Sequence, residues 1–262
     1  MRTFIIPTLG RLHNQITYNN MPESVQKRTH FVVQSHEADE AIHLFGAESV
    51  RILPPSINRI GPTRQWIWEE YRGTDHAVFD DDIKVTHRGT GKYVLSAEED
   101  WKLLESTVDS WHKSDRPICS LGTTWAPPPP DPFSDNGRIM TNWWFSANLT
   151  HPLDWTRVPA GEDLDVVLQT LTAGIQNRIS YDFLASVGGT NSAGGCSTWR
   201  NIDVHNESQR KLAALWPDFV KMSEKDVKSG PWKGQKKINV TLLCKKAYKS
   251  SQRNSVVDDI FA

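Results

Sequence analysis

The stretch His76–Asp82, with the sequence HAVFDDD, runs from a short apolar segment directly into three adjacent carboxylates. The apolar segment predicts a buried strand, and open α/β sheets bind ligands at the carboxyl ends of their strands. Three neighbouring carboxylates repel one another unless water solvates them or a cation neutralises them. A solvated acidic turn is the alternative, but the strand before this aspartate triplet favours a ligand site.

Apolar, β-branched segments alternate with helical segments on both sides of this stretch, which is the pattern of βα units in a largely parallel sheet. Further strands are predicted at Arg2–Ile6, Thr29–Gln34, Val50–Leu53, Pro117–Ser120 and Arg138–Asn148. Helices are predicted at Arg11–Asn19, His36–Phe45, Gly61–Tyr71, Ser96–Lys113, Gly161–Ala173 and Glu207–Met222. The predicted fold class is therefore α/β, with a sheet flanked by helices.

Composition narrows the class of protein. The 262 residues are 38% hydrophobic and 23% charged, and the net charge of −1 gives no overall field towards nucleic acid, so any such contact needs a local patch. Cys119, Cys196 and Cys244 lack the spacing of a disulfide framework or a zinc site. No apolar run is long enough to span a membrane, and we expect a cytoplasmic protein without membrane contact.

Three acidic or imidazole features could carry chemistry. The oxygens of the aspartate triplet suit Mg²⁺ or Mn²⁺ bridging a diphosphate. Glu162 and Asp163 open a predicted helix, where a carboxylate can act as a general base or as a cap. His205 could complete a metal site as a neutral imidazole. Taken singly, acids at helix starts are usually structural and most lone histidines are not ligands.

The order of these features resembles the GT-A glycosyltransferases. The resemblance covers residues 1–222 and rests on Pro7–Arg11, Gly61–Arg64, Asp80–Asp82, Gly161–Asp163 and His205. It implies a Rossmann-like nucleotide-sugar-binding sheet, with a donor half over residues 1–120 and an acceptor half over residues 121–222. Residues 223–262 would then form a basic C-terminal extension.

A second, narrower resemblance lies within that fold. Asp80–Ile83, the loop Gly194–Thr198 with Arg200, and His205 are similar to the phage TET-associated DNA base glycosyltransferases. This resemblance implies metal-dependent transfer from a UDP-sugar to the hydroxymethyl group of a modified pyrimidine in DNA, such as 5-hydroxymethylcytosine, in the host cytoplasm. Direct displacement by the acceptor would invert the anomeric carbon, although retaining enzymes share this fold.

The resemblance also implies roles for individual residues. Those expected to bind the nucleotide-sugar are Thr8, Arg11, Glu37, Arg64, Asp80 and Asp81. The expected metal ligands are Asp82, which comes first, His205 and Asp80. Asp163 is expected as the general base with Glu162 beside it, and helix capping is the alternative for this pair.

The acceptor side combines a basic segment with aromatic residues. Lys221–Arg253 holds ten basic and two acidic residues, with Trp232 and Tyr248 among them, which suits duplex DNA but also a solvated tail. The predicted acceptor-binding residues are Gly195, Cys196, Trp199, Arg200, Trp143 and Trp144. The loop Asn191–Cys196 could instead be a plain connector, and the tryptophans could pack in the core.

Two other functions stay open at this point. The same catalysis could act on a saccharide, lipid or protein acceptor. A nucleotide- or nucleic-acid-binding domain without turnover is the alternative of another class. The combination of Asp82, Asp163 and His205 argues against the silent domain, because binding alone does not need a base and a metal site together.

Overall fold

The structure is a computed structural model that describes residues 1–90, 94–125, 129–187 and 195–261. For Thr90, Cys196, Ser197 and residues 253–261 it describes the backbone alone. One large sheet contains β1 (Thr3–Pro7), β2 (Thr29–Val33), β3 (Val50–Ile52), β4 (His76–Phe79), β5 (Ile83–His87), β6 (Ile118–Thr123), β7 (Phe133–Asp135), β8 (Asn142–Phe145) and β9 (Asn177–Val187).

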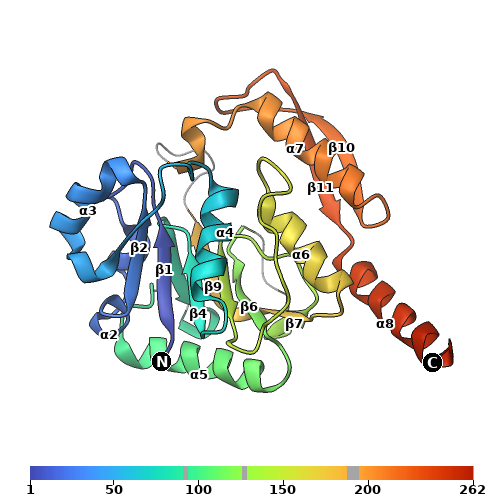
Figure 1. The fold of residues 1–262 in the computed structure, drawn as a ribbon, viewed down its shortest axis with the longest axis horizontal. Coiled ribbons are helices and arrows are strands. Elements are labelled where there is room, and N and C mark those ends of the chain that lie inside the picture. Colours follow the sequence, from blue (N-terminus) through green and yellow to red (C-terminus); the bar gives the residue numbers. More distant parts are fainter. Residues whose placement is uncertain (91–93, 126–128, 188–194, 262) are drawn as a thin grey trace.

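The helices are α1 (Ile16–Asn19), α2 (Glu23–Gln26), α3 (Ala38–Phe45), α4 (Ile60–Tyr71), α5 (Glu98–Lys113), α6 (Glu162–Thr172), α7 (Ile202–Leu215) and α8 (Cys244–Phe261). Short 3-10 turns lie at η1 (Ser35–Glu37), η2 (Ala47–Ser49), η3 (Arg88–Thr90) and η4 (Gly195–Thr198). Figure 1 shows α4 and α6 over one face of the sheet and α7 beside a separate hairpin. None of the helices in the described ranges is long and apolar enough to cross a membrane.

The strand order of the large sheet is β3-β2-β1-β4-β8-β6-β9-β5, with β7 paired to β9. Strands β3, β2, β1 and β4 run parallel to one another, and β8 is antiparallel to both β4 and β6. Helices connect the parallel strands, as such connections require. The α/β prediction is confirmed, and the buried strand predicted before the aspartate triplet is observed as β4.

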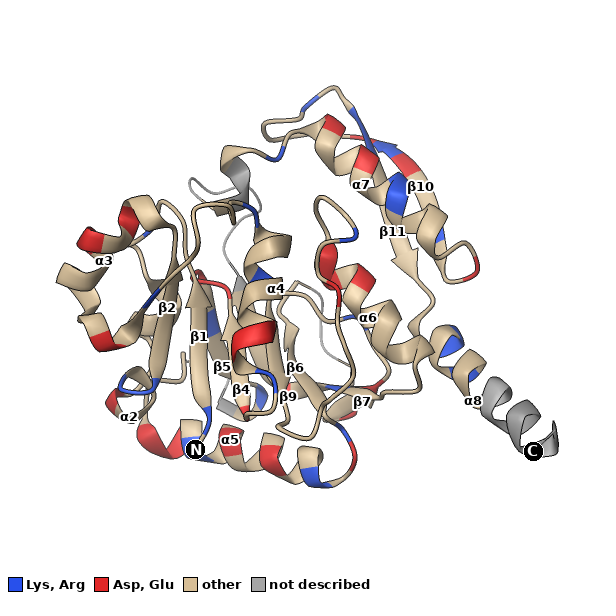
Figure 2. Ribbon diagram, viewed as in Figure 1, with Lys and Arg blue, Asp and Glu red and all other residues tan. Residues whose placement is uncertain are grey.

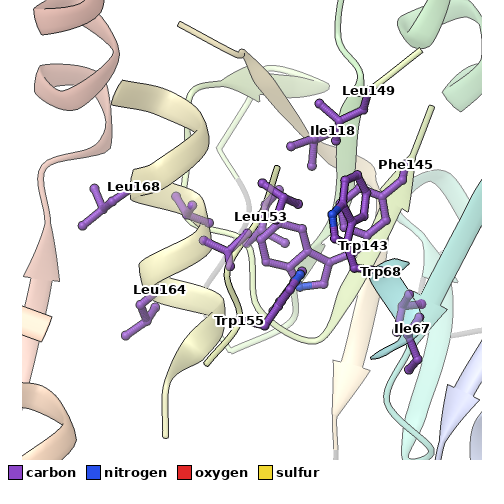
Figure 3. Packing of buried hydrophobic residues seen from close by; sticks show 14 of the residues in the cluster. Ile67, Trp68, Ile118, Trp143, Phe145, Leu149, Leu153, Trp155, Leu164 and Leu168 are labelled. Atoms are coloured by element: carbon purple, nitrogen blue, oxygen red, sulfur yellow. The ribbon is translucent and has the colours of Figure 1, made fainter. Parts of the chain in front are cut away.

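Alternation along the strands divides the core into two layers. On β8, Trp143 belongs to the cluster under α4 and α6, and Trp144 belongs to the cluster that contains Trp101 of α5. Successive side chains of a strand point to opposite faces, which explains the split. Figure 3 shows the first cluster, in which the Trp143 and Trp155 rings meet edge to face at 5.1 Å. The sheet is thus buried on both faces, as a parallel α/β sheet requires.

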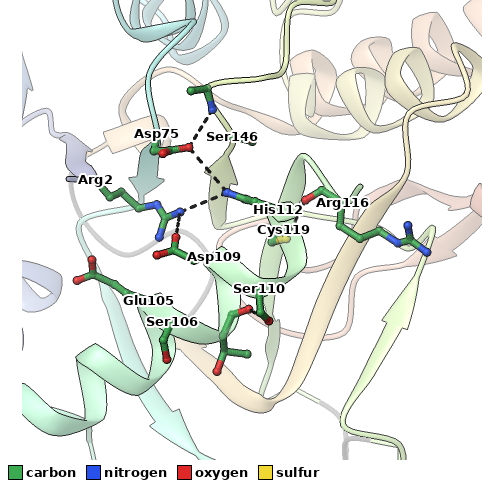
Figure 4. A network of polar contacts seen from close by, with 12 residues as sticks. Arg2, Asp75, Glu105, Ser106, Asp109, Ser110, His112, Arg116, Cys119 and Ser146 are labelled. Atoms are coloured by element: carbon green, nitrogen blue, oxygen red, sulfur yellow. Dashed lines mark hydrogen bonds and ion pairs between the residues drawn. The ribbon is translucent and has the colours of Figure 1, made fainter. Parts of the chain in front are cut away.

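A polar network closes the end of the sheet where β4 begins (Figure 4). The buried Arg2 guanidinium lies 2.8 Å from Asp109 and 3.3 Å from the ring of His112, and Asp75 accepts a bond from the backbone of Ala147. Burial lowers the pKa of His112 to about 4, with Arg2 acting in the same direction. The neutral ring and the ion pair fasten α5 to the sheet, at the end opposite the aspartate triplet.

The C-terminal part differs from its prediction. The helix expected at Glu207–Met222 ends at Leu215, two residues before Pro217, and Val220–Asp226 forms strand β10 instead. Strand β10 pairs antiparallel with β11 (Lys236–Leu242). Proline cannot continue the helix, and the residue before it is driven towards extended backbone. The helix expected at Arg11–Asn19 likewise shortens to α1, and strands β5 and β9 were not predicted.

Candidate active site

A cavity of about 490 Å³ opens beyond the carboxyl ends of β1 and β4. Most of the site residues predicted from the sequence line this cavity. The predicted residues that line it are Thr8, Arg11, Arg64, Asp80, Asp81, Asp82, Glu162, Asp163, Gly195, Trp199, Arg200 and His205. Parallel strands deliver their carboxyl ends to one edge, so residues far apart in sequence meet there.

Backbone contacts hold the aspartate triplet in place. The amide of Asp80 donates to the carbonyl of Thr141 at 3.1 Å, and the Thr17 hydroxyl donates to the carbonyl of Asp80 at 2.6 Å. The amide of Ile83 in turn donates to the Thr17 hydroxyl at 2.8 Å. The turn between β4 and β5 is therefore tied to α1 and to the segment before β8.

Arg11 and Thr8 engage the second and third aspartates. Arg11 Nη1 lies 2.7 Å from Asp81 Oδ1 and 3.2 Å from Asp82 Oδ2, and the Thr8 hydroxyl donates to Asp81 Oδ2 at 2.9 Å. Burial raises the pKa of Asp81, while Arg11 and Thr8 oppose that rise. Asp81 is only 5% exposed, and both of its carboxylate oxygens bind side chains of the protein.

Arg64 joins the triplet to the start of α6. Its Nη2 lies 2.9 Å from Asp80 Oδ1, and its Nη1 lies 2.8 Å from Glu162 Oε1. The side chains of Arg64 and Glu162 are 8% and 5% exposed, so each neutralises a charge that burial would otherwise penalise. Burial also raises the pKa of Asp80 to about 7, against the opposite effect of Arg64.

The triplet fits a hard divalent cation through two of its members. Asp80 and Asp82 leave 32% and 19% of their side chains exposed, and each contacts an arginine through one oxygen, so its second oxygen can coordinate an ion. Mg²⁺ and similar ions are usually held by one or two carboxylates, with substrate phosphates and water completing the shell. Within the described ranges, no group of three or more His, Cys, Asp or Glu side chains could hold a metal.

His205 lines the cavity from α7, on a different element from the triplet. Its Nε2 lies 2.9 Å from the carbonyl oxygen of Ile238, so Nε2 carries the proton and donates it. Burial lowers the pKa of the ring, and the cations Lys237 and Arg200 add to that effect. The neutral ring therefore keeps its lone pair on Nδ1.

Asp163 and Glu162 begin α6 after Gly161, which adopts a left-handed conformation with φ 78°. The Glu162 carboxylate pairs with Arg64, whereas the Asp163 carboxylate lines the cavity. Burial and the neighbouring charge of Glu162 raise the pKa of Asp163 to about 6, although Arg64 and Arg138 lower it. A carboxylate with a raised pKa is a better proton acceptor than a solvated one.

The conformation of Gly161 yields a stability prediction. A Cβ there would meet no atom closer than 3.4 Å, so the cost of Gly161→Ala comes from its φ of +78°. We expect Gly161→Ala to lower the free energy of unfolding by roughly 1–2 kcal/mol. Gly161→Asn is the matched control, because Asn tolerates this region, and it should cost less. Denaturant midpoints compare the two, and equal midpoints would contradict the backbone explanation.

The remaining predicted residues have varied positions. Glu37 does not line the cavity; its carboxylate accepts the Gly10 amide at 2.7 Å and so holds the loop that carries Thr8 and Arg11. Trp143 and Trp144 are 1% and 0% exposed, and core packing describes both. Residues 191–194 lie outside the described ranges, as does the side chain of Cys196.

Several lining residues were not nominated by the sequence. They are Arg59, Trp125, Arg138, Gln209, Lys237 and Asn239, among others. Trp125 is 58% exposed, an unusual exposure for so large an aromatic ring. The four prolines that follow Trp125 marked a loop but gave no direction to its side chain.

A sheet of this order, with an acidic strand end and an acidic helix start around one cavity, fits a glycosyltransferase of GT-A fold, and sequence comparison identifies the chain as a glycosyltransferase. The family model described as TET-associated glycosyltransferase matches residues 3–195, and the chain belongs to that family. This match confirms the family inferred from the motifs, and the observed sheet agrees with the predicted fold class.

Curated relatives are enzymes of two phages. The chain is 21% identical to the beta-glucosyl-HMC-alpha-glucosyl-transferase of Enterobacteria phage T2, over 93% of this chain and 91% of that protein. It is 22% identical to the enzyme of the same name from phage T6, over 87% and 85%. Among solved structures, S. aureus TarS 1-349 in complex with UDP-GlcNAc matches 81% of this chain and 65% of that chain, with a TM-score of 0.49 and 13% identity. The chain thus spans slightly under two thirds of that structure.

Proposed function

We propose that this protein uses a divalent cation to transfer a sugar from a UDP-sugar to the hydroxymethyl group of a modified pyrimidine in DNA. The observation that carries the proposal is the shared cavity: Asp163, a half-buried carboxylate with a raised pKa, lines it together with Asp80 and Asp82. A base and a phosphate-binding acidic edge on one cavity are what sugar transfer from a nucleotide needs. The names of the phage relatives support a modified base as the acceptor.

On the donor side, the loop after β1 and the triplet would bind the nucleotide. Thr8, Arg11 and Asp81 form a rigid unit, because Gln15 donates to the Thr8 hydroxyl at 2.9 Å and to the Arg11 carbonyl at 2.9 Å. Such preorganisation lowers the entropy lost on binding. Glu37 would act by holding this loop, and Arg64 by holding Asp80 in position.

In the proposed reaction, the hydroxymethyl oxygen of the acceptor attacks the anomeric carbon. The bond from that carbon to the diphosphate oxygen breaks, and UDP leaves with the bonding electrons. The hydroxyl proton passes to Asp163. Asp80 and Asp82 would hold a cation that would supply Lewis-acid neutralisation of the diphosphate charge. His205 lines the same cavity, but within the described ranges it forms no three-residue metal-binding group with them. Glu162 is paired with Arg64, so Asp163 is the better candidate for the base.

The stereochemistry of the product distinguishes two versions of this chemistry. Direct displacement assisted by Asp163 gives inversion. The names of the phage relatives specify an alpha-glucosyl transfer to a beta-glucosyl acceptor, so a base that already carries a glucosyl group belongs among the acceptors to be tested. The anomeric proton coupling of the product reports its configuration, and retention would exclude direct displacement.

The pH dependence of transfer follows from Asp163. Its pKa is about 6, set by burial and by Glu162 against Arg64 and Arg138. Only the deprotonated carboxylate accepts the proton, so we expect kcat/KM to rise with pH through about 6 and then level off. A rate profile over a pH series tests this. A slope that continues unchanged well above neutrality would point to a different base.

The deciding experiment measures donor and acceptor together. The protein, Mn²⁺ and a panel of UDP-sugars are incubated with unmodified, hydroxymethylated and glucosylated DNA, and the digested nucleosides are weighed. A mass gain of one sugar on one modified base is the expected result. Transfer to a glycan without any gain on DNA would favour a saccharide acceptor, and absence of both transfer and donor hydrolysis would favour a silent binding domain.

A further inference from the structure

Cationic and aromatic side chains lie together along one wall of the cavity and beside it. The members of this cation–aromatic strip are Arg59, Trp199, Arg200, Lys237 and Trp232. The Arg59 guanidinium lies 5.4 Å from the ring centroid of Trp199, and Lys237 Nζ lies 5.7 Å from that of Trp232. Arg59, Trp199, Arg200 and Lys237 all line the cavity.

The members of the strip come from three segments of the chain. Trp199 and Arg200 are adjacent in sequence. Lys237 and Arg200 line the same cavity, and burial lowers the pKa of Lys237, with the charge of Arg200 acting in the same direction. The ring of His205 lies 5.5 Å from that of Trp232 and extends the aromatic surface. Like charges gathered in this way are stabilised by a bound anion.

The cations of the strip differ from those of the donor side. Arg11 and Arg64 are each held by two carboxylates. In the part of the chain that the structure describes, Lys237 and Arg59 make no ion pair with a carboxylate. Their charges are therefore available to a ligand without breaking an internal pair.

The strip also comes from a different part of the chain. Except for Arg59, its members lie beyond residues 3–195, the range that the family model matches. They stand on the segment before α7 and on the β10–β11 hairpin, where basic residues are spread with a few acidic ones among them (Figure 2). Acidic residues also stand at the end of β4 and at the start of α6. The wall is thus added to the donor site by a segment outside the matched range.

We propose that the cation–aromatic strip binds a strand of the acceptor nucleic acid, with phosphates on Lys237 and Arg59 and an unstacked base against Trp199. The proposal rests on the proposed DNA acceptor. Cations next to aromatic rings suit a nucleic-acid strand, since cations contact the phosphates and each base offers a face for stacking. A nucleotide taken out of a duplex would present its hydroxymethyl group to the cavity in this way.

Lys236 and Lys237 provide a matched pair of variants. Neighbouring strand residues point to opposite faces. Lys236 is 70% exposed with its Nζ 3.0 Å from Glu224, whereas Lys237 lines the cavity. Lys237→Gln and Lys236→Gln remove the same charge one residue apart, so they separate a site contact from a general field.

The test measures binding of hydroxymethylated duplex DNA to the full-length protein over a salt series, without donor. We expect Lys237→Gln to weaken DNA binding roughly tenfold and to reduce the salt slope by about 1. Binding of UDP with Mn²⁺ should stay within about twofold of wild type. A change of this size corresponds to less free energy than the loss of one hydrogen bond to a charged group. Lys236→Gln should leave both affinities near wild type, and Lys237→Arg should restore DNA binding.

Three results would overturn the strip assignment. Equal losses for Lys237→Gln and Lys236→Gln would mean a diffuse charge effect. A loss of UDP affinity with DNA affinity intact would assign Lys237 to the donor diphosphate. If Lys237→Gln has the melting temperature of wild type and changes neither affinity, Lys237 does not contact the DNA. Sugar transfer to a glycan alone is a separate outcome, because it removes the DNA acceptor itself.

Discussion

The Asp163→Asn variant is expected to lose sugar transfer by roughly 10³-fold while binding UDP as wild type does, because a positioned general base contributes about 10²–10⁴-fold. Asn keeps the size and the position at the start of α6 but cannot accept a proton. Asp163 has no part in the contacts that hold the triplet, which run through Arg11 and Arg64. Single-turnover transfer and calorimetric UDP binding measure the two properties separately.

Glu162→Gln is the control for Asp163→Asn. It changes the neighbouring acid, whose carboxylate is 2.8 Å from Arg64, and it removes one of the two carboxylates that neutralise the buried Arg64, so that only Asp80 remains paired with it. We expect this variant to lose stability more than chemistry, with kcat changed less than in Asp163→Asn. Normal transfer by Asp163→Asn would show that the base has been assigned to the wrong residue.

The second large effect concerns the metal. We expect Asp82→Asn to abolish the dependence of UDP binding on Mn²⁺, a loss on the order of a hundredfold in affinity if the cation contributes several kcal/mol to diphosphate binding. The change preserves the shape of the side chain, and Arg11 keeps its shorter contact with Asp81 at 2.7 Å. UDP titrations with Mn²⁺ and with a chelator give the measurement.

Asp163→Asn is the control for this second prediction, since it should retain the full response to Mn²⁺. A wild-type response in Asp82→Asn would reject Asp82 as a ligand. Asp80→Asn would then be the variant to test, because Asp80 is the other member of the triplet with substantial exposure, at 32% of its side chain. If UDP binding by the wild-type protein does not change with Mn²⁺, the proposed metal dependence is wrong.

Local patterns were sufficient for the donor half. The strands around β4 are short apolar runs that end at prolines or acids. Such continuous apolar runs are typical of strands that are buried on both faces of a parallel sheet. Once β4 is a central strand, its topology places the triplet at the edge where the other strands also end. The positions of Thr8 and of the triplet could therefore be predicted without a structure.

Sequence patterns were insufficient for the C-terminal part. The segment from Lys221 to Lys237 is polar and lysine-rich, so neither helical nor strand periodicity stands out, and a surface hairpin gives no strong apolar alternation. The hairpin forms because β10 and β11 pair with each other and pack beside α7. Its contribution to the cavity wall was therefore not predicted.

The sequence by itself determined an α/β fold whose acidic triplet follows a buried strand, because burial and strand ends are encoded locally. The glycosyltransferase class came from the resemblance of the motifs and from the family match. Only the tertiary structure decided which of the three aspartates binds the protein's own side chains with both oxygens and which stay partly exposed. All three aspartates line the cavity, but Asp81 is enclosed by Arg11 and Thr8, whereas Asp80 and Asp82 leave 32% and 19% of their side chains exposed. Contacts such as Arg64 with Glu162, which are 98 residues apart, depend on how the chain packs.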